Sequence, residues 1–357
     1  MSLDSYRTLG RSGLRVSPLT LGTMTFGDDW GWGSSPEEST KILATYLDRG
    51  GNSVDTANLY TNGHSEQIIG DHLHGRSSLR DRVVLGTKFF GNLYPKDPNG
   101  GGPGRKAIVQ QLENSLRRLR TDYVDLYWLH NFDPATPVEE TLRALDDLVA
   151  AGKIRYVGFS DVPAWATAEA ATIARLRGWS PIIALQLEYS LLERTAEGEL
   201  IPMAAALGMG VMPWSPLKGG FLSGKYSSTG AADVDTTRGN TPSAADYVVI
   251  DALNAVAAEA GTTAAKIALS WLAGRPGVTS TVIGARRMDQ FETNLGALEI
   301  TLTDQQRATL DEVSAPTLNF PAENNRLLAP TIQFAGATVD GRTTATNQLL
   351  EASDTRY

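Results

Sequence analysis

The chain has 357 residues, of which 41% are hydrophobic and 20% charged, with a formal net charge of −8 and no cysteine. The lack of cysteine excludes disulfides, thiolate metal sites and a cysteine nucleophile. The acidic charge argues against binding to nucleic acid or to an acidic membrane, because both need a basic face. No signal peptide is recognisable, and no apolar stretch approaches the ~18 residues of a membrane span. We therefore expect a cytoplasmic protein with no nucleic-acid or membrane partner.

The first predicted element is a tight hairpin at residues 9–14, placed to close the floor of a barrel. After it, apolar runs rich in β-branched residues alternate about eight times with longer helical patterns, which indicates an α/β protein with a closed parallel sheet. The expected strands lie at residues 19–26, 52–57, 83–88, 124–130, 155–160, 182–187, 210–214 and 279–283.

Amphipathic helices are expected between these strands. Ser35 followed by Pro36 is typical of a helix start, and Thr303 opens a last helix that ends near Val313. Apolar residues recur at helical spacing in two further segments, at Ile108, Leu112, Leu116 and Leu119 and at Val138, Leu142, Leu145 and Val149.

Two loops and the end of the chain do not follow this alternation of strands and helices. Residues 91–104 and 227–243 are rich in small and polar residues, and loops of such length are usually functional lids or disordered. We expect the first of them to be a mobile loop at the barrel mouth. Our interpretation is a single barrel domain over residues 1–314 and an irregular C-terminal tail over residues 315–357, packed against the barrel or its mouth.

Four chemically active side chains stand at or just beyond the ends of expected strands, namely Asp55, Tyr60, Lys88 and His130. The carboxyl ends of barrel strands form one mouth, where barrel enzymes carry out their chemistry. A phenol has a pKa of about 10, too high for an efficient acid at neutral pH. A nearby Lys88 ammonium would lower that pKa, Asp55 would keep the lysine charged, and neutral His130 would orient a carbonyl group. The set points to carbonyl reduction, and the alternative is a structural ion pair between Asp55 and Lys88.

Three other kinds of site find little support. His64, His72 and His74 lack the one-face spacing of a metal pair, so no metal is expected. Residues 219–225 match G-x-x-x-x-G-K, but Tyr226 stands where a nucleotide-hydrolysing P-loop needs Ser or Thr. No G-x-G-x-x-G follows a strand, which argues against a Rossmann dinucleotide site.

Seven motifs occur in order along the chain. They read DTANLY at residues 55–60, GHSE at 63–66, TKF at 87–89, LHN at 129–131, GKIRYVGFS at 152–160, QLEYSLL at 186–192 and WSPL at 214–217. In these motifs the chain resembles the aldo-keto reductase superfamily, closest to its bacterial and potassium-channel-β-like branches. The resemblance implies a (β/α)8 TIM barrel that uses NAD(P)H without a metal.

The resemblance also implies a role for individual residues. Tyr60 would be the general acid, with Asp55 and Lys88 tuning it and His130 orienting the carbonyl. Ser160, Asp161 and Gln186 would hold the nicotinamide carboxamide, and Trp214 would stack on the nicotinamide ring. The implied cofactor contacts are Gly22, Thr23, Met24, Ser160, Asp161, Gln186, Trp214, Ser215, Pro216, Leu217, Gly219, Ile283, Gly284, Arg286, Gln290 and Asn294.

Three departures from the family pattern bear on the cofactor. Asp161 replaces the usual asparagine, Ala285 lacks a hydroxyl, and Thr293 replaces a common acid near the adenine. A preference for NADP(H) over NAD(H) therefore rests mainly on Arg286, with Arg287 second. The alternative is that both arginines are solvated charges at a helix start.

We expect an NADP(H)-dependent enzyme that reversibly reduces an aldehyde or ketone to an alcohol. One alternative is a nucleotide-binding regulatory subunit of the channel-β type with little turnover. A barrel lyase or isomerase is disfavoured by Trp214 and by the stretch from Arg286 to Asn294. The carbonyl substrate would meet an aromatic-rich pocket formed by Met24, Phe26, Trp30, Trp32, Phe89 and Asn131.

The tail carries more apolar residues than a purely solvated extension needs, among them Leu318, Phe320, Leu327, Leu328, Ile332 and Phe334. Two interpretations stay open. The tail either returns to the substrate mouth or covers the barrel flank or a subunit contact.

Overall fold

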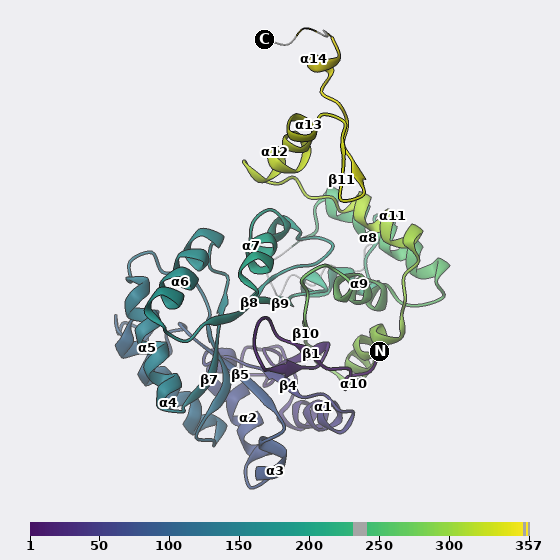
Figure 1. Cartoon of the computed structure of the whole chain (residues 1–357). Helices are drawn as coiled ribbons and strands as arrows, with labels where there is room; N and C mark the ends of the chain where they lie inside the picture. Colours follow the sequence, from purple (N-terminus) through teal and green to yellow (C-terminus); the bar gives the residue numbers. More distant parts are fainter. Residues whose placement is uncertain (231–240, 353–354, 356–357) are drawn as a thin grey trace.

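The computed structural model describes residues 1–230, 241–352 and 355, and within them eight parallel strands form a barrel with helices outside it (Figure 1). The strands follow one another around the ring in chain order from β3 to β9, with β10 beside β3. Between β9 and β10 the ring closes through a parallel bridge of Val211 and Val278, where the Thr279 N–H donates to the Val211 carbonyl at 2.8 Å. The expected (β/α)8 barrel is confirmed. Its strands are β3 (Leu19–Gly22), β4 (Ser53–Asp55), β5 (Val84–Phe89), β6 (Val124–Leu129), β7 (Ile154–Ser160), β8 (Ile182–Glu188), β9 (Gly210–Trp214) and β10 (Thr281–Ile283).

The first barrel strand is shorter than the sequence predicted. The range 19–26 was wrong at its C-terminal end, because β3 stops at Gly22 and the chain turns there. The Phe26 N–H donates to the Thr23 carbonyl at 3.0 Å, and the Ser34 N–H donates to the Thr25 carbonyl at 2.8 Å. Residues 23–34 therefore form a loop at the carboxyl end of β3 instead of more strand.

The outer helices begin and end where local chemistry favours it. The predicted helix starts at Ser35 and Thr303 are confirmed: Ser35 accepts a hydrogen bond from the Glu38 N–H, and Thr303 forms a reciprocal capping box with Gln306. The apolar positions of the two periodic segments face the barrel, with Ile108 and Leu112 fully buried. The helices of the barrel region are α1 (Pro36–Asp48), α2 (His64–Leu73), α3 (Ser77–Arg80), α4 (Arg105–Leu119), α5 (Val138–Ala150), α6 (Ala164–Arg177), α7 (Leu200–Leu207), α8 (Ala244–Glu259), α9 (Ala264–Ala273), α10 (Met288–Leu295) and α11 (Asp304–Val313).

A hairpin of β1 (Arg7–Thr8) and β2 (Arg15–Val16) closes the barrel floor, as expected. Leu9 and Val16 are fully buried and pack against Trp128 and Met212 inside the barrel. Burying such side chains stabilises the fold by roughly 1.5–3 kcal/mol each. Gly10 makes the close approach possible: its φ is +58°, and a Cβ there would lie 2.2 Å from the Ile183 carbonyl oxygen.

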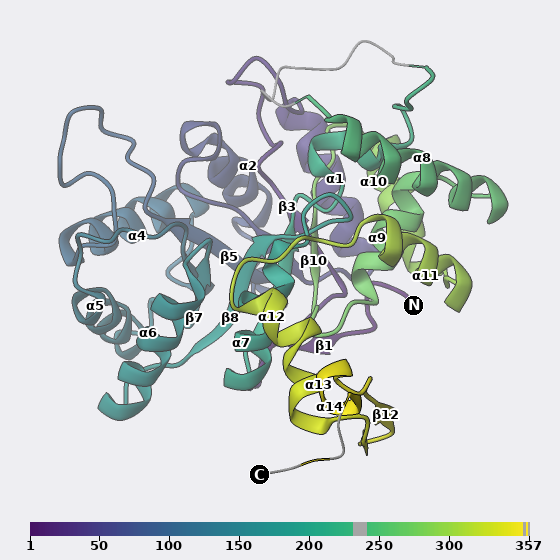
Figure 2. The same ribbon diagram turned by 90° about the horizontal axis from the view of Figure 1, so that it is seen from above.

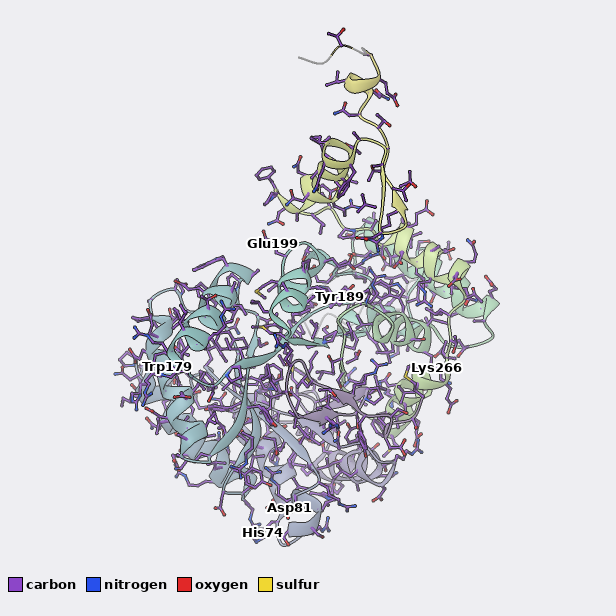
Figure 3. All side chains as sticks on the ribbon, viewed as in Figure 1. His74, Asp81, Trp179, Tyr189, Glu199 and Lys266 are labelled. Carbon is purple, nitrogen blue, oxygen red and sulfur yellow. The ribbon has the colours of Figure 1, made fainter. Side chains whose placement is uncertain are left out.

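A polar network ties the loop after β8 to α9 and α11. Tyr189, labelled in Figure 3, donates to Glu197 at 2.6 Å and accepts from Arg275 at 3.0 Å. Arg275 also pairs with Asp311 at 2.8 Å, and Arg194 donates to the Asp311 carbonyl at 2.9 Å. The network fixes the outer wall of the barrel behind β8 and β9.

The tail folds into short elements that project from the barrel on the side opposite α2 (Figures 1 and 2). Leu318 and Ala322 are its buried apolar residues among those described, and both lie beside Gly198. Phe320 is 83% exposed, and Leu327 and Ile332 are also exposed. The tail elements are α12 (Ala322–Leu327), α13 (Ala329–Phe334), β11 (Thr338–Val339), β12 (Arg342–Thr343) and α14 (Gln348–Glu351).

The predictions for the two long loops, residues 91–104 and 227–243, stay untested, as does the division into a barrel domain and a tail. Residues 91–104 form a series of turns, in which the Gly102 N–H donates to the Phe90 carbonyl at 2.8 Å. Most of the other loop, residues 231–240, lies outside the described residues.

None of the helices in the described part of the chain combines the length and the apolar composition that a membrane crossing requires.

Candidate active site

Three neighbouring strands bring Asp55, Lys88 and His130 to one end of the barrel. Asp55 is the last residue of β4, Lys88 is in β5, and His130 directly follows β6. Lys88 is fully buried and its Nζ donates to Asp55 Oδ2, to the Thr56 carbonyl at 2.9 Å and to the Tyr60 hydroxyl at 3.2 Å. The lysine therefore joins the carboxylate and the phenol in one hydrogen-bonded cluster. The sequence expected this convergence, and the structure brings the four side chains together.

Tyr60 is positioned by a turn of left-handed backbone. Thr61, Asn62 and Gly63 have φ angles of +46°, +58° and +96°. Left-handed backbone is costly for a residue with a Cβ unless neighbouring contacts stabilise it. Here the Thr61 hydroxyl donates to the Phe26 carbonyl at 2.8 Å and accepts from the Ser65 N–H at 3.0 Å. The turn is thus held between the β3 loop and the start of α2.

The pKa of Tyr60 is raised, which corrects one expectation. Burial raises it more than the Lys88 ammonium lowers it, and the Asp55 and Asp161 carboxylates raise it further. The lysine acts in the predicted direction but does not dominate. For Lys88 itself, burial lowers the pKa, yet Asp55 and Tyr60 more than offset that and leave it raised. The site therefore holds an ammonium beside a neutral phenol at neutral pH.

His130 faces Tyr60 edge-on, with ring centroids 5.9 Å apart. Burial, with a smaller contribution from the Lys88 charge, lowers its pKa to about 3. The ring is therefore neutral at physiological pH and offers one N–H donor. Its buried Nδ1 has no hydrogen-bond partner among the described residues. A neutral imidazole at this place can hydrogen-bond to a bound polar group.

The carboxyl ends of β7, β8 and β9 carry a second polar cluster. Gln186 Nε2 donates to Asp55 Oδ1 at 3.1 Å, which links this cluster to the first. Trp214 Nε1 donates to Asp161 Oδ1 at 3.1 Å, and the Ser160 hydroxyl lies 3.3 Å from Asp161 Oδ2. Trp214 is partly exposed at the mouth. All four residues assigned to the nicotinamide lie at neighbouring strand ends.

The segment after Trp214 is a loop of left-handed residues. Ser215, Lys218, Gly219 and Gly220 have φ angles of +52°, +45°, +65° and +109°. A Cβ at Gly220 would meet no atom within 4 Å, so the backbone there faces open space. Pro216 is buried and Leu217 partly so. The P-loop-like residues 219–225 begin inside a 3-10 helix, Lys218–Ser223, with no P-loop strand–helix junction.

The remaining cofactor candidates lie between β10 and α10 and beside β3. Asn294 Nδ2 donates to the Gly284 carbonyl at 3.2 Å, and Gln290 Oε1 accepts from the Arg286 N–H at 3.0 Å. These two side chains therefore shape the loop that carries Arg286. Arg287, by contrast, pairs with Asp289 at 2.9 Å on the exposed helix start. Ile283 is buried in the core and Gly22 is packed against Val282.

The remaining candidates for cofactor or substrate contact, most of them in the loop after β3, differ in whether they are buried or exposed. Thr23 is fully buried, and its N–H and hydroxyl both donate to the Asp55 carbonyl at 3.0 Å. Met24 is exposed, and Trp30 and Trp32 lie with ring centroids 5.6 Å apart. Phe26 and Phe89 are fully buried in the hydrophobic core, so the expectation that they line the substrate pocket was wrong. Phe89 follows the inward-facing Lys88 and therefore points to the other side of its strand.

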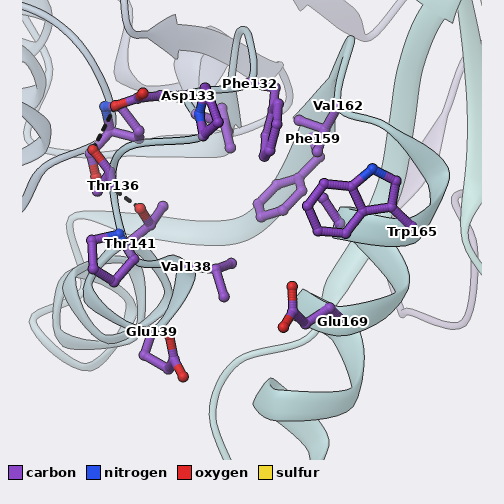
Figure 4. A pocket seen from close by; sticks show the side chains of 15 residues that line it. Phe132, Asp133, Thr136, Val138, Glu139, Thr141, Phe159, Val162, Trp165 and Glu169 are labelled. Atoms are coloured by element: carbon purple, nitrogen blue, oxygen red, sulfur yellow. Dashed lines mark hydrogen bonds between the residues drawn. The ribbon is translucent and has the colours of Figure 1, made fainter.

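A separate cavity of about 260 Å³ lies outside this cluster, behind β6 and β7 (Figure 4). Its wall includes Leu129, Phe132, Phe159 and Trp165, and none of the four catalytic candidates lines it.

The described residues contain no group of three or more His, Asp or Glu side chains arranged to hold a metal.

Sequence reasoning missed the side chains that support the cluster from behind. Trp128 fills the barrel below it, and a Cβ at Gly86 or Gly158 would lie 3.1 Å or 2.3 Å from its ring. Glu66 is fully buried, accepts from the Thr87 hydroxyl at 2.5 Å and pairs with Arg118 at 2.6 Å. The sequence did contain a signal for this role, because Glu66 is a charged residue on the otherwise apolar face of α2. Glu66 lies within the GHSE motif but had been given no role.

Comparison with known proteins places the chain in a family. Residues 18–315 match the model of the aldo/keto reductase family. An uncharacterized oxidoreductase of Bacillus subtilis, YrpG, is 37% identical over 86% of this chain and 95% of its own length. A probable voltage-gated potassium channel subunit beta of Oryza sativa is 37% identical over 83% of this chain and 91% of its own. Norsolorinic acid reductase stcV of Emericella nidulans is 34% identical over 87% and 81%. The chain belongs to the aldo/keto reductase family, whose members are oxidoreductases that generally use NAD(P)H.

Proposed function

We propose that this enzyme reduces an aldehyde or ketone to an alcohol with NADP(H), and that Tyr60 donates the proton. The observation that carries the proposal is the buried Lys88 ammonium, which holds Asp55, the Thr56 carbonyl and the Tyr60 hydroxyl at one point of the mouth. A charge buried this completely is costly even when it is paired and hydrogen-bonded, which suggests that the site keeps it for its chemistry. Carbonyl reduction uses it, because the phenol needs a nearby cation when it loses its proton.

Each residue around Tyr60 has a separate role in the proposed proton transfer. The Tyr60 hydroxyl protonates the carbonyl oxygen as charge develops there, and Lys88 stabilises the phenolate that remains. Asp55 keeps Lys88 charged and fixed. Neutral His130 donates a hydrogen bond to the same carbonyl oxygen and sets its direction. Because these donors are already in place, little reorganisation accompanies the reaction.

The mouth fits a nicotinamide nucleotide in shape and chemistry. Trp214 presents a partly exposed ring on which a flat nicotinamide can stack, with Asp161 at the edge of that ring and Ser160 and Gln186 at the neighbouring strand ends. The loop after Trp214 has left-handed backbone at Ser215 and from Lys218 to Gly220, and its backbone at Gly220 faces open space, as a phosphate-binding loop requires. When bound, the reduced nicotinamide supplies the hydride that the carbonyl carbon accepts. Arg286 is our candidate for contact with a 2′-phosphate, which makes NADP(H) the expected form.

A regulatory role with little turnover is the second candidate, and the Oryza sativa relative named as a channel subunit favours it. The two functions differ in one measurable way. We would mix the full-length protein with NADPH and a panel of aldehydes and ketones and follow the near-ultraviolet absorbance of the reduced cofactor. Reduction predicts consumption that requires both the protein and a carbonyl compound. Tight NADPH binding without consumption across aliphatic, aromatic and dicarbonyl compounds would contradict it and support the regulatory role.

A further inference from the structure

Asp161 occupies the position where the family pattern has asparagine, and the structure holds its carboxyl group firmly. Its backbone is left-handed, with φ of +52°, and its N–H donates to the Gln186 carbonyl at 3.2 Å. Oδ1 accepts from the Trp214 indole N–H at 3.1 Å, and Oδ2 lies 3.3 Å from the Ser160 hydroxyl. The carboxyl group therefore stands at the edge of the indole ring on which we place the nicotinamide.

The charges around Asp161 leave it without an opposite partner. Lys88 is paired with Asp55, and Lys218 pairs with Glu188 at 2.7 Å. Tyr60, which interacts electrostatically with Asp161, is neutral at physiological pH, and the nearby Glu188 carboxylate repels the Asp161 charge instead of pairing with it. Across the described part of the chain, no Lys, Arg or His comes within ion-pairing distance of its oxygens. When it is ionised, Asp161 is the excess negative charge of this part of the site.

Its ionisation is poised near neutrality. Asp161 as a whole residue is exposed at the mouth, but partial removal of its carboxyl group from water raises the pKa of Asp161 to about 6, against the lowering effect of the hydrogen bonds from Trp214 and Ser160. Glu188 raises the pKa further, and Lys88 lowers it slightly. The group is therefore mostly a carboxylate at neutral pH and mostly a neutral acid below about pH 5.

We propose that Asp161 sets the preference of this site between the two redox forms of the cofactor, favouring the oxidised, cationic nicotinamide over the reduced, neutral ring. The inference rests on the proposed function, because it needs the nicotinamide on Trp214. The physical reason is the charge on the ring: a carboxylate at its edge attracts the cation and is indifferent to the neutral form. An asparagine amide carries no net charge and cannot discriminate in this way. The residue thereby biases the site toward the oxidised form of the cofactor.

The test compares NADP+ and NADPH binding by calorimetry in the wild-type protein, Asp161→Asn and the control Glu169→Gln. Asn is isosteric with Asp and tolerates left-handed backbone, so Asp161→Asn should fold normally. Glu169→Gln removes the same charge from α6, the helix that follows Asp161, outside the mouth. The ratio of the two dissociation constants is the readout, since it cancels the titration of phosphates that both forms carry.

At about pH 7.5 we expect Asp161→Asn to shift this ratio against NADP+ by about two- to tenfold, the size of a partly screened charge contact. At about pH 5.5 the difference from wild type should shrink, because the wild-type carboxyl is then largely protonated. Glu169→Gln should leave the ratio unchanged at both pH values.

Two results would overturn the inference alone: a ratio in Asp161→Asn equal to wild type at the higher pH, or an equal shift in Glu169→Gln. In both, binding of the two cofactor forms and carbonyl-dependent NADPH consumption would persist. Failure of the wild-type protein to bind either form would instead overturn the proposed function, and this inference with it.

Discussion

At the barrel mouth Lys88 is fully buried beside Asp55, whereas in the tail Phe320 is 83% exposed. The barrel buries charge and surrounds it with hydrogen bonds, while the tail exposes apolar surface that the described chain does not cover. Burying a charge is costly, so a paired and hydrogen-bonded charge at strand ends indicates a site kept for its chemistry. Exposed apolar residues on short elements indicate a surface whose purpose lies outside the barrel. The predictions below test this contrast.

The largest effect is expected from Lys88→Met. This change leaves the Asp55 carboxylate buried without its cation, which should lower the free energy of unfolding by roughly 3–5 kcal/mol. Activity should be lost as well. Urea unfolding and carbonyl-dependent NADPH consumption measure the two effects.

The double variant Lys88→Met with Asp55→Asn separates those effects. Removing both charges should restore much of the stability but none of the activity, because the phenol still lacks its cation. Recovery of activity together with stability would reduce the pair to a structural ion pair, the alternative that the sequence left open.

Arg286→Ala tests the outer end of the proposed cofactor site. A charge-assisted contact to a phosphate contributes roughly 1.5–3 kcal/mol, so NADPH binding should weaken about 10- to 100-fold while NADH binding changes little. Arg287→Ala is the matched control, because Arg287 pairs with Asp289 on the exposed helix start. Fluorescence titration with both cofactors checks the prediction. Equal weakening of NADPH and NADH by Arg286→Ala would exclude a role in phosphate recognition.

Burial of His130 predicts a dependence of stability on pH. Its pKa is lowered to about 3 in the folded protein, against about 6.5 in an unfolded chain. The unfolded state therefore binds the proton first as pH falls, and His130 removes stability below about pH 6.5. The loss approaches 2 kcal/mol by about pH 5. Chemical unfolding at several pH values should show a shallower loss in His130→Gln, and identical slopes would contradict a buried neutral imidazole.

Stopping the chain after Ala315 should have the smallest effect on catalysis. The tail contacts the barrel at Gly198, beside α7, and its described helices project away from the barrel (Figures 1 and 2), so we expect kcat, KM and cofactor affinity to change by less than about threefold. A modest fall in Tm, or a change in oligomeric state, would come from loss of the Leu318 contact and of exposed apolar surface. Leu318→Ala in the full chain isolates the first cause. A raised KM or an altered substrate preference would show that the tail reaches the mouth.

The parts of the fold that repeat were predictable from the sequence, and the parts that depend on local turns were not. Alternating apolar runs located the barrel strands closely, and capping residues such as Ser35 or helical spacing located four of the outer helices, α1, α4, α5 and α11. The end of β3 was missed because residues 23–26 alternate threonine with an apolar residue, as a strand does, while hydrogen bonds from the Ser34 and Phe26 N–H groups turn the chain at that point. The tail lacked any period, and its short elements depend on neighbouring turns.

The same limit applies to the site. Strand ends predicted that Asp55, Lys88 and His130 would converge. The direction in which the neighbouring side chains point was harder to predict. Phe26 and Phe89 were expected to line the substrate pocket, although both lie in the core. The raised pKa of Tyr60 could not be foreseen, since it depends on how far burial outweighs Lys88. The hydrogen bond from Trp214 to Asp161 joins residues 53 positions apart and has no signal in the sequence.

The most direct test of the proposed chemistry is Tyr60→Phe, which removes the phenolic oxygen and leaves the ring. NADPH affinity and Tm should stay close to those of the wild-type protein, while kcat for carbonyl reduction falls by about 10²–10⁴-fold, as expected for loss of a general acid. A kcat close to the wild-type value, with cofactor affinity unchanged, would contradict the assignment of Tyr60 as the proton donor.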